Sequence, residues 1–198
     1  MSKTSTGRPI NIEFTGTPEA GKTTQFKIIS STLQEEGYKV VTVRESAEVV
    51  PACFGKASPD WHRWMGLHTI MNLLCANAED ADIIIVDRGY VDHLIWQEVY
   101  CGEGKISDRE KTASYEYFRQ FIPMPDMVFV FSVPPDVSIE RRGGEGRITN
   151  RSFISRYNPL LDSFFESYEG CVCRVDATLT IPEVSQLLMD NIHSILGQ

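Results

Sequence analysis

The chain is short of positive charge, of long apolar runs and of an apolar leader. It has 19 lysines and arginines against 27 aspartates and glutamates, a formal net charge of −8 at pH 7. Surfaces that bind nucleic acid need clustered basic side chains, so this balance argues against a nucleic-acid partner. No run approaches the roughly 20 apolar residues that cross a bilayer. We therefore expect a cytoplasmic protein with no membrane partner, in which residues 1–8, polar throughout, form a disordered tail.

Cysteine is also scarce, and its spacing does not favour cross-links. The five cysteines are odd in number and include no C-x-x-C pair. This pattern is typical of a reducing compartment with free, mostly buried thiols. None of the four histidines stands at metal-ligand spacing from a cysteine or a carboxylate, so we expect no structural metal.

Short apolar segments alternate with helical patterns, which predicts an α/β fold with a parallel sheet covered on both faces. The expected strands are 10–14, 39–43, 83–86, 127–133 and 171–175, and the expected helices are 21–36, 61–79, 90–100, 107–122, 136–142, 150–168 and 181–196. Helix 61–79 carries Trp64, Leu67, Ile70 or Met71, and Leu74 at helical spacing, which predicts its apolar face. No linker rich in glycine, serine or proline divides the chain, so we predict a single domain over residues 1–198.

The segment between the first expected strand and helix is a phosphate-binding motif. Gly16-Thr17-Pro18-Glu19-Ala20-Gly21-Lys22-Thr23 fits G-x-x-x-x-G-K-[ST] without a mismatch. Such a loop turns its backbone N–H groups onto a polyphosphate at a helix N-terminus. Lys22 would then reach the β- and γ-phosphates, and Thr23 would hold Mg²⁺. The sequence predicts a nucleoside triphosphate site formed by Gly16, Thr17, Glu19, Ala20, Gly21, Lys22, Thr23 and Thr24.

Charged pairs follow two other expected strands. Asp87 and Arg88 close the strand 83–86, where an acid beside such a loop is placed for a second Mg²⁺ contact. Arg88 would face the phosphoryl group or the acceptor, and Arg44 and Glu45 follow the strand 39–43. Ligands in open α/β sheets lie beyond the carboxyl ends of the strands, so both pairs are expected near the phosphate loop. A surface ion pair is the plainer interpretation of each.

A glycine-rich segment, 141–149, carries Arg141, Arg142 and Arg147. Phosphoryl transfer spreads negative charge over several oxygens, and arginines on a flexible flap offset it. We interpret 141–149 as a lid over the triphosphate, with Arg151 as a companion and Glu19 helping to hold the lid closed. The alternative is a solvated basic loop.

The order of these motifs resembles the P-loop nucleoside and nucleotide kinases, in particular thymidylate kinases and deoxynucleoside kinases. The resemblance implies a single-domain three-layer α/β/α P-loop kinase fold with a five-stranded parallel sheet and an arginine-bearing lid, and ATP and Mg²⁺ as cofactors. It also implies that Glu45 orients or deprotonates an acceptor hydroxyl and that Arg44 binds an anion. Asp176 and Ala177 are similar to a turn that packs against adenine in thymidylate kinases, although they also fit a plain helix cap.

The resemblance assigns a role to each candidate residue. The catalytic residues would be Lys22, Glu45, Arg88, Arg142 and Arg147; the Mg²⁺ ligands Thr23 and Asp87; the ATP contacts beyond the loop Arg141, Asp176 and Ala177; and the acceptor contacts Arg44, Glu45, Trp64, His68 and Arg88. Asp92 and His93 follow on the next helix and are candidates to face the same cleft. Trp64 and His68 have an alternative interpretation as half-buried packing residues.

Some positions depart from the thymidylate kinase pattern. Pro18 stands where those enzymes commonly have an acid, and Ser46 replaces a proline after Glu45. Helix 61–79 offers His68, Asn72 and Asn77 where they carry an arginine for the acceptor phosphate. We therefore predict ATP-dependent phosphoryl transfer to a nucleotide or nucleoside, and leave open another small hydroxyl compound as acceptor, or a regulatory P-loop ATPase switch. Related enzymes are often dimers, which makes a homodimer a weaker expectation.

Overall fold

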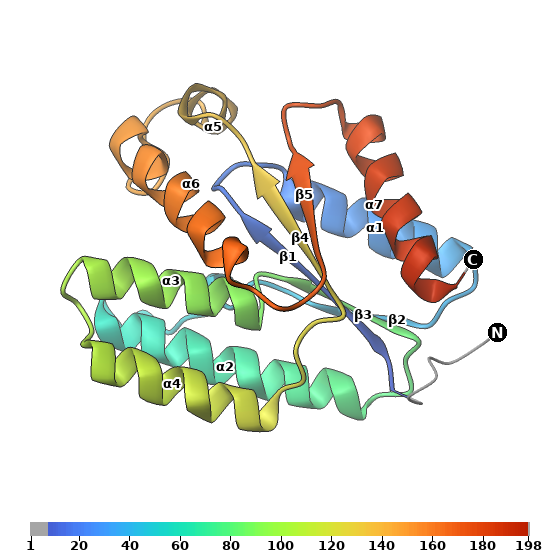
Figure 1. The fold of residues 1–198 in the computed structure, drawn as a ribbon, viewed down its shortest axis with the longest axis horizontal. Coiled ribbons are helices and arrows are strands. Elements are labelled where there is room, and N and C mark those ends of the chain that lie inside the picture. The colour runs from blue at the N-terminus through green and yellow to red at the C-terminus, as the bar shows by residue number, and fades with distance from the viewer. Residues whose placement is uncertain (1–7, 198) are drawn as a thin grey trace.

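The computed structural model describes residues 8–197, and its centre is a five-stranded parallel sheet (Figure 1). The strands are β1 (Ile10–Gly16), β2 (Val40–Val43), β3 (Ile83–Asp87), β4 (Met127–Ser132) and β5 (Val172–Asp176). Their order across the sheet is β2-β3-β1-β4-β5, and every neighbouring pair is parallel. The predicted α/β fold with a five-stranded parallel sheet is confirmed, whereas the arginine-bearing lid stays a prediction. Each predicted strand is present within two residues of its expected ends.

The helices form one layer on each face of the sheet. They are α1 (Lys22–Glu35), α2 (Pro59–Ala78), α3 (Tyr90–Gly102), α4 (Asp108–Phe121), α5 (Pro135–Arg142), α6 (Arg151–Glu166) and α7 (Ile181–Leu196), with a short 3-10 turn at Ser46–Glu48. One core cluster joins α1 and α7 to one face, and the other joins α2, α3, α4 and α6 to the opposite face. Successive strand residues point to opposite faces, so the sheet supplies both clusters.

Strand β1 is buried on both faces but is not apolar on both. Ile12 and Phe14 join the cluster under α1 and α7. Asn11, Glu13 and Thr15 point to the other face, and each is at most 5% exposed. Buried polar groups require hydrogen-bond partners, and the partners of Glu13 and Thr15 lie on α3 next to the candidate site.

The predicted apolar face of α2 is wrong except at Ile70, which is buried. Leu67, Met71 and Leu74 are 61%, 53% and 47% exposed, respectively. The buried face instead contains Gly66, where an added Cβ would lie 2.6 Å from Nε2 of His93. Gly66 lets α2 approach α3 closely, and the buried side of α2 also contains Ile70 and Leu73, while three large apolar side chains remain at the surface. The expected homodimer stays a prediction.

The predictions for the termini and thiols have mixed outcomes. Residues 1–7 of the predicted tail lie outside the described residues, whereas Arg8 is held by Asp126, with Nη2 2.6 Å from Oδ1.

The five cysteines are free, as predicted, but none is buried, because they lie in loops, on outer helix faces and on the edge strand β5. Across residues 8–197, no helix has the length and apolar character needed to span a membrane.

Candidate active site

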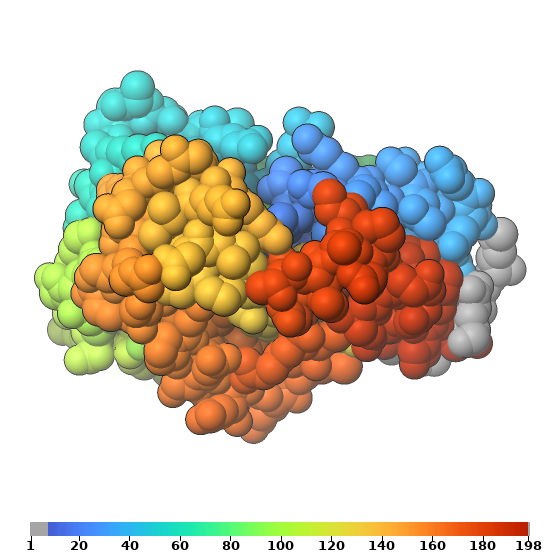
Figure 2. All heavy atoms as spheres, turned by 90° about the horizontal axis from the view of Figure 1, so that it is seen from above, coloured from blue at the N-terminus to red at the C-terminus, as the bar shows by residue number. Residues whose placement is uncertain are grey.

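The phosphate-binding loop joins β1 to α1 at the carboxyl edge of the sheet, the edge that Figure 2 faces. Gly16 has φ 125°, and a Cβ there would lie 2.0 Å from the main-chain oxygen of Phe131, so only glycine fits this close approach of two strands. Gly21 has φ 84° and stands immediately before α1. The local sequence thus directs the N-terminus of α1 into the loop, as an anion site requires.

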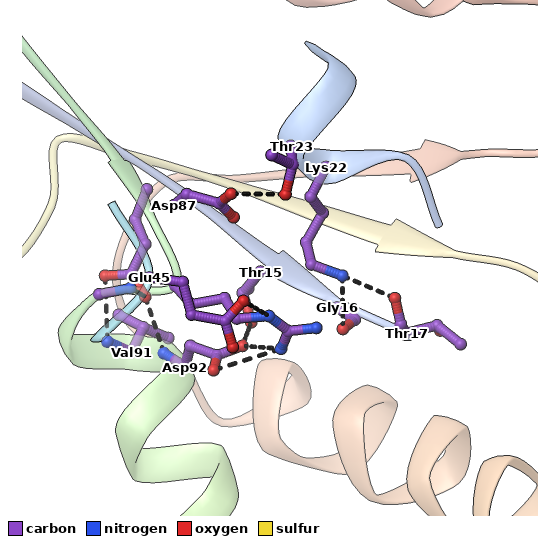
Figure 3. A network of polar contacts seen from close by, with 12 residues as sticks. Thr15, Gly16, Thr17, Lys22, Thr23, Glu45, Asp87, Val91 and Asp92 are labelled. Carbon is purple, nitrogen blue, oxygen red and sulfur yellow. Dashed lines mark hydrogen bonds and ion pairs between the residues drawn. The ribbon is translucent and has the colours of Figure 1, made fainter. Parts of the chain in front are cut away.

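Lys22 is buried inside this loop (Figure 3). Its Nζ donates to the main-chain oxygens of Gly16 at 3.1 Å and Thr17 at 2.6 Å. Burial, and then the charge of Arg88, lower the pKa of Lys22 to about 7 against the opposing effect of nearby carboxylates. The amine is therefore held against main-chain oxygens of the loop, and its role in binding phosphate stays a prediction.

Thr23 and Asp87 meet beside Lys22, as the sequence predicts. The Thr23 hydroxyl donates to Oδ2 of Asp87 at 2.7 Å, and Oδ1 of Asp87 is buried without a partner. A hydroxyl and a carboxylate with one uncommitted oxygen suit Mg²⁺, which prefers oxygen ligands and shares its coordination with substrate phosphates. In residues 8–197 no group of three or more histidine, cysteine and acidic side chains is placed to hold a metal by itself.

Arg88 connects the ends of β2 and β3. Its Nε lies 3.3 Å from Oε2 of Glu45, and its Nη1 lies 3.1 Å from Oδ1 of Asp92. Burial raises the pKa of the Glu45 carboxyl, while the charge of Arg88 lowers it and that of Asp92 raises it. Arg88 also has φ 58°, a backbone conformation that is uncommon for a residue with a side chain and is found at functional sites.

Two of the predicted acceptor contacts, Trp64 and His68, lie near Glu45, and their role stays a prediction. The rings of Trp64 and His68 stack 4.6 Å apart, and Nδ1 of His68 is 3.0 Å from the hydroxyl of Ser46. Ser46 directly follows Glu45, so these α2 side chains adjoin the Glu45–Arg88 pair. Arg44, in contrast, is exposed after β2 and forms no ion pair within the described residues.

The segment predicted as a lid, 141–149, touches the phosphate-binding loop through Arg141, which lies in the last turn of α5. Its Nη2 donates to the main-chain oxygen of Ala177 at 2.7 Å and its Nη1 to that of Glu19 at 3.4 Å. A pocket of about 300 Å³ lies at this junction; it is lined by Glu19, Ala20, Gly21, Thr24, Gln25, Arg141, Ala177, Leu179, Ile181 and Val184. In Figure 2 the yellow-orange lid, the blue loop and the red turn after β5 lie close together at this edge.

The remaining predicted site residues are Asp176 and the arginines Arg142, Arg147 and Arg151. The Asp176 carboxylate accepts from the amide and the hydroxyl of Thr178, and Thr180 is the N-cap of α7, so Asp176 forms a turn before the helix and is not its cap. Arg142 and Arg147 are exposed, and neither forms an ion pair within residues 8–197. Arg151 pairs with Asp136. The catalytic roles of these arginines stay predictions.

Sequence reasoning missed several residues of the site. The Thr15 hydroxyl donates to Asp92, and the Thr17 hydroxyl donates to Oδ1 of Asn158, whose own amide reaches the main-chain oxygen of Val133. The sequence could have indicated Thr15, because it directly precedes Gly16 at a strand end. No sequence pattern indicated Asn158, because it lies in the middle of α6 and approaches the loop only in the folded chain.

Comparisons with known proteins agree with this geometry. No family model matches the chain. The thymidylate kinase of Gluconobacter oxydans is 26% identical to it over 210 residues, which cover 96% of this chain and 97% of that protein. A probable thymidylate kinase of Archaeoglobus fulgidus is 23% identical over 92% of this chain and 94% of its own. The structure of deoxyadenosine kinase from M. mycoides with products bound superposes with a TM-score of 0.66 at 18% identity, over 94% of this chain and all of the other.

The sheet order and the loop are those of the P-loop kinase α/β fold. Within that class the chain resembles thymidylate kinases along nearly its whole sequence and deoxyadenosine kinase in its fold. The predicted resemblance to P-loop nucleoside and nucleotide kinases is therefore confirmed, and with it the prediction of a kinase-type phosphotransferase.

Proposed function

We propose that the protein is an ATP-dependent kinase that phosphorylates a hydroxyl group of a nucleoside. One observation carries the proposal: the Lys22 and Thr23–Asp87 groups lie beside the Glu45–Arg88 pair at one edge of the sheet (Figure 3). The first set suits the phosphates of a donor, and the second suits an acceptor. The thymidylate and deoxyadenosine kinases that the chain resembles support both halves.

The donor would lie along the loop, with its phosphates against the backbone N–H groups and Lys22. The adenine would occupy the pocket between Arg141 and Ala177. Thr23 and Asp87 would hold Mg²⁺, which offsets charge on the β- and γ-phosphates when bound. The buried, unpartnered Oδ1 of Asp87 supports this assignment.

The acceptor reaction needs a base and a fixed geometry. The acceptor hydroxyl oxygen forms a bond to the γ-phosphorus, the bond from that phosphorus to the β,γ-bridging oxygen breaks, and ADP leaves. The hydroxyl proton passes to the Glu45 carboxylate. A carboxyl whose pKa is raised by burial is a better proton acceptor than an exposed one, and Arg88 keeps it oriented.

The charges near Glu45 favour an uncharged acceptor over a monophosphate. Arg88 is shared between two carboxylates, Glu45 and Asp92. On α2, Arg63 is held by Asp60 and Glu110. A phosphate dianion would require uncommitted cations, and next to Glu45 the only such side chain among the described residues is Arg44, which is exposed after β2; the α2 side chains near Ser46 are His68 and Asn72, which offer hydrogen bonds.

The test is acceptor-stimulated ADP release from Mg·ATP, measured with nucleosides and their matched 5′-monophosphates. We expect at least one nucleoside to stimulate ADP release more strongly than its monophosphate. Lys22→Ala should abolish the release and weaken ATP binding, and Glu45→Gln should reduce turnover by about 10²-fold. Glu48→Gln, an exposed carboxylate on the same turn, is the matched control.

Two results would redirect the proposal. Stimulation by monophosphates alone would replace the nucleoside with a nucleotide acceptor. No stimulation across the panel, together with unchanged ATP affinity in Lys22→Ala, would refute the kinase. The relatives do not favour the regulatory ATPase alternative, for which a protein and no small molecule would stimulate hydrolysis.

A further inference from the structure

The carboxylate of Asp92 is not used to cap the helix on which it lies. Helix α3 starts directly after Gly89, and its N-cap has no side-chain hydrogen bond of its own. Instead the Glu13 carboxylate, from β1, accepts from the backbone N–H groups of Gly89 at 3.1 Å, Val91 at 3.0 Å and Asp92 at 2.7 Å. An acid in the first turn of a helix ordinarily interacts with these free N–H groups. Because Glu13 accepts the hydrogen bonds from these N–H groups, the Asp92 side chain is available for another role.

Asp92 has two side-chain partners, both in the candidate site (Figure 3). The Thr15 hydroxyl donates to its Oδ1 at 2.6 Å. Arg88 Nη1 donates to Oδ1 at 3.1 Å and lies 3.4 Å from Oδ2. Thr15 stands one residue before the phosphate-binding loop, so Asp92 links the donor side of the site to the arginine on the acceptor side.

Arg88 therefore pairs with two carboxylates, of which Asp92 is buried and Glu45 is partly exposed. The Asp92 side chain is 4% exposed and that of Glu45 is 30% exposed, while Arg88 itself is 10% exposed. A buried guanidinium needs a partner at all times, since desolvation of an unpaired charge is costly. Without Asp92, Glu45 would be the remaining carboxylate in contact with Arg88, and the acceptor would have to displace it from that pair.

We propose that Asp92 is a positioning residue that, together with Thr15, holds the Arg88 guanidinium throughout the reaction, so that Glu45 can exchange Arg88 for the acceptor hydroxyl. Asp92 touches neither substrate and acts through Arg88 and Glu45. This inference rests on the proposed function, in which Glu45 receives the hydroxyl proton.

The first experiment separates kcat from KM in Asp92→Asn, which keeps the shape of the side chain and removes its charge. We expect kcat to fall about tenfold or more, because Arg88 then binds Glu45 more tightly. The KM for ATP should stay within about twofold of the wild-type value, since Lys22, Thr23 and the base pocket are unchanged. Glu98→Gln, on the same helix and paired with Lys111, is the matched control and should leave both constants unchanged.

The second experiment distinguishes positioning from a purely structural role. In an Arg88→Gln background, Asp92→Asn should cost little further activity, because the group on which Asp92 acts is already absent. Thr15→Val, which removes one hydroxyl, should lower kcat about threefold with an unchanged melting temperature. Thr15→Val also carries the test if Asp92→Asn does not fold.

The outcomes separate this inference from the proposed function. If Glu45→Gln abolishes turnover but Asp92→Asn and Thr15→Val keep the wild-type kcat, Asp92 has no positioning role and the kinase assignment stands. An equal loss from Asp92→Asn in the wild-type and Arg88→Gln backgrounds also overturns the inference. If Glu45→Gln turns over as fast as the wild type, the proposed base is wrong and the inference falls with it.

Discussion

The Thr23 hydroxyl donates to Oδ2 of Asp87 at 2.7 Å, and the other carboxylate oxygen of Asp87 is buried without a partner. Replacing Asp87 with asparagine keeps a carbonyl oxygen for Thr23 but removes the charge that a divalent cation requires. We expect Asp87→Asn to raise the Mg²⁺ concentration needed for half-maximal turnover by about tenfold to a hundredfold. A Mg²⁺ titration of ADP release measures the effect, and Asp190→Asn, on the surface of α7, is the control. An unchanged Mg²⁺ requirement would show that Asp87 does not serve the cation.

The contact between the lid and the phosphate loop runs through main-chain oxygens. Arg141 donates to Ala177 and Glu19 through their carbonyl groups, not to the Glu19 carboxylate. Arg141→Met should therefore raise the KM for ATP about tenfold, since it removes charge-assisted hydrogen bonds beside the base pocket. Glu19→Ala should have a much smaller effect because it keeps the main-chain oxygen. Equal effects of the two substitutions would restore the role that the sequence suggested for the Glu19 side chain.

The Glu13 carboxylate supports the N-terminus of α3 and should contribute measurably to stability. Glutamine at this position would place an NH₂ group against at least one of the backbone donors. We expect Glu13→Gln to lower the free energy of unfolding by about 2–3 kcal/mol, which is the cost of buried donors left unsatisfied. Urea unfolding at pH 7 provides the measurement, with Glu98→Gln as the reference substitution on α3. A loss below about 0.5 kcal/mol would mean that water or a shift of the helix satisfies the amides.

His62 makes stability depend on acidity. Its ring lies between those of His93, 4.2 Å away, and Tyr100, 4.4 Å away, and its Nε2 is buried without a partner. Burial lowers the pKa of His62 to about 4. The unfolded chain therefore binds a proton there between about pH 6.5 and 4 that the folded chain does not, and stability falls as the pH falls through this window.

His62→Phe isolates this effect, because phenylalanine keeps the stacked ring and cannot be protonated. Between pH 7 and pH 4, the wild type should lose up to about 3 kcal/mol more free energy of unfolding than the variant. Urea unfolding of both proteins across this range measures the difference, and the contributions of titrating groups remote from His62 cancel. Parallel losses in the two proteins would exclude His62 as a source of acid sensitivity.

Much of the fold followed from local sequence pattern. Helix α7 begins and ends at the predicted residues, and the five strands lie where the apolar runs predicted them. These elements are specified by short-range features: apolar period, capping residues and glycine stops. The pairing of Thr23 with Asp87 was also predictable, because the carboxyl ends of neighbouring parallel strands meet at one edge.

Tertiary contacts decided what the pattern left ambiguous. Helix α2 has apolar residues on more than one side; the side that contains Gly66, Ile70 and Leu73 packs inward, whereas Leu67 and Leu74 are exposed. Similarly, Glu13 and Thr15 interrupt an apolar strand, and only the packing of α3 against β1 shows that they face Gly89 and Asp92.

The sequence by itself determined the phosphate-binding loop, the parallel sheet and the charged residues at the strand ends, since each is encoded within a few consecutive residues. Only the tertiary structure decided that Arg88 is shared between Glu45 and Asp92, and that a carboxylate from β1 caps α3. The contacts of Arg88 with Glu45 and of Glu13 with α3 join residues more than 40 positions apart. The contact of Arg88 with Asp92 uses an acid that would ordinarily cap its own helix. The energy of all three contacts depends on burial, which a local sequence pattern does not show.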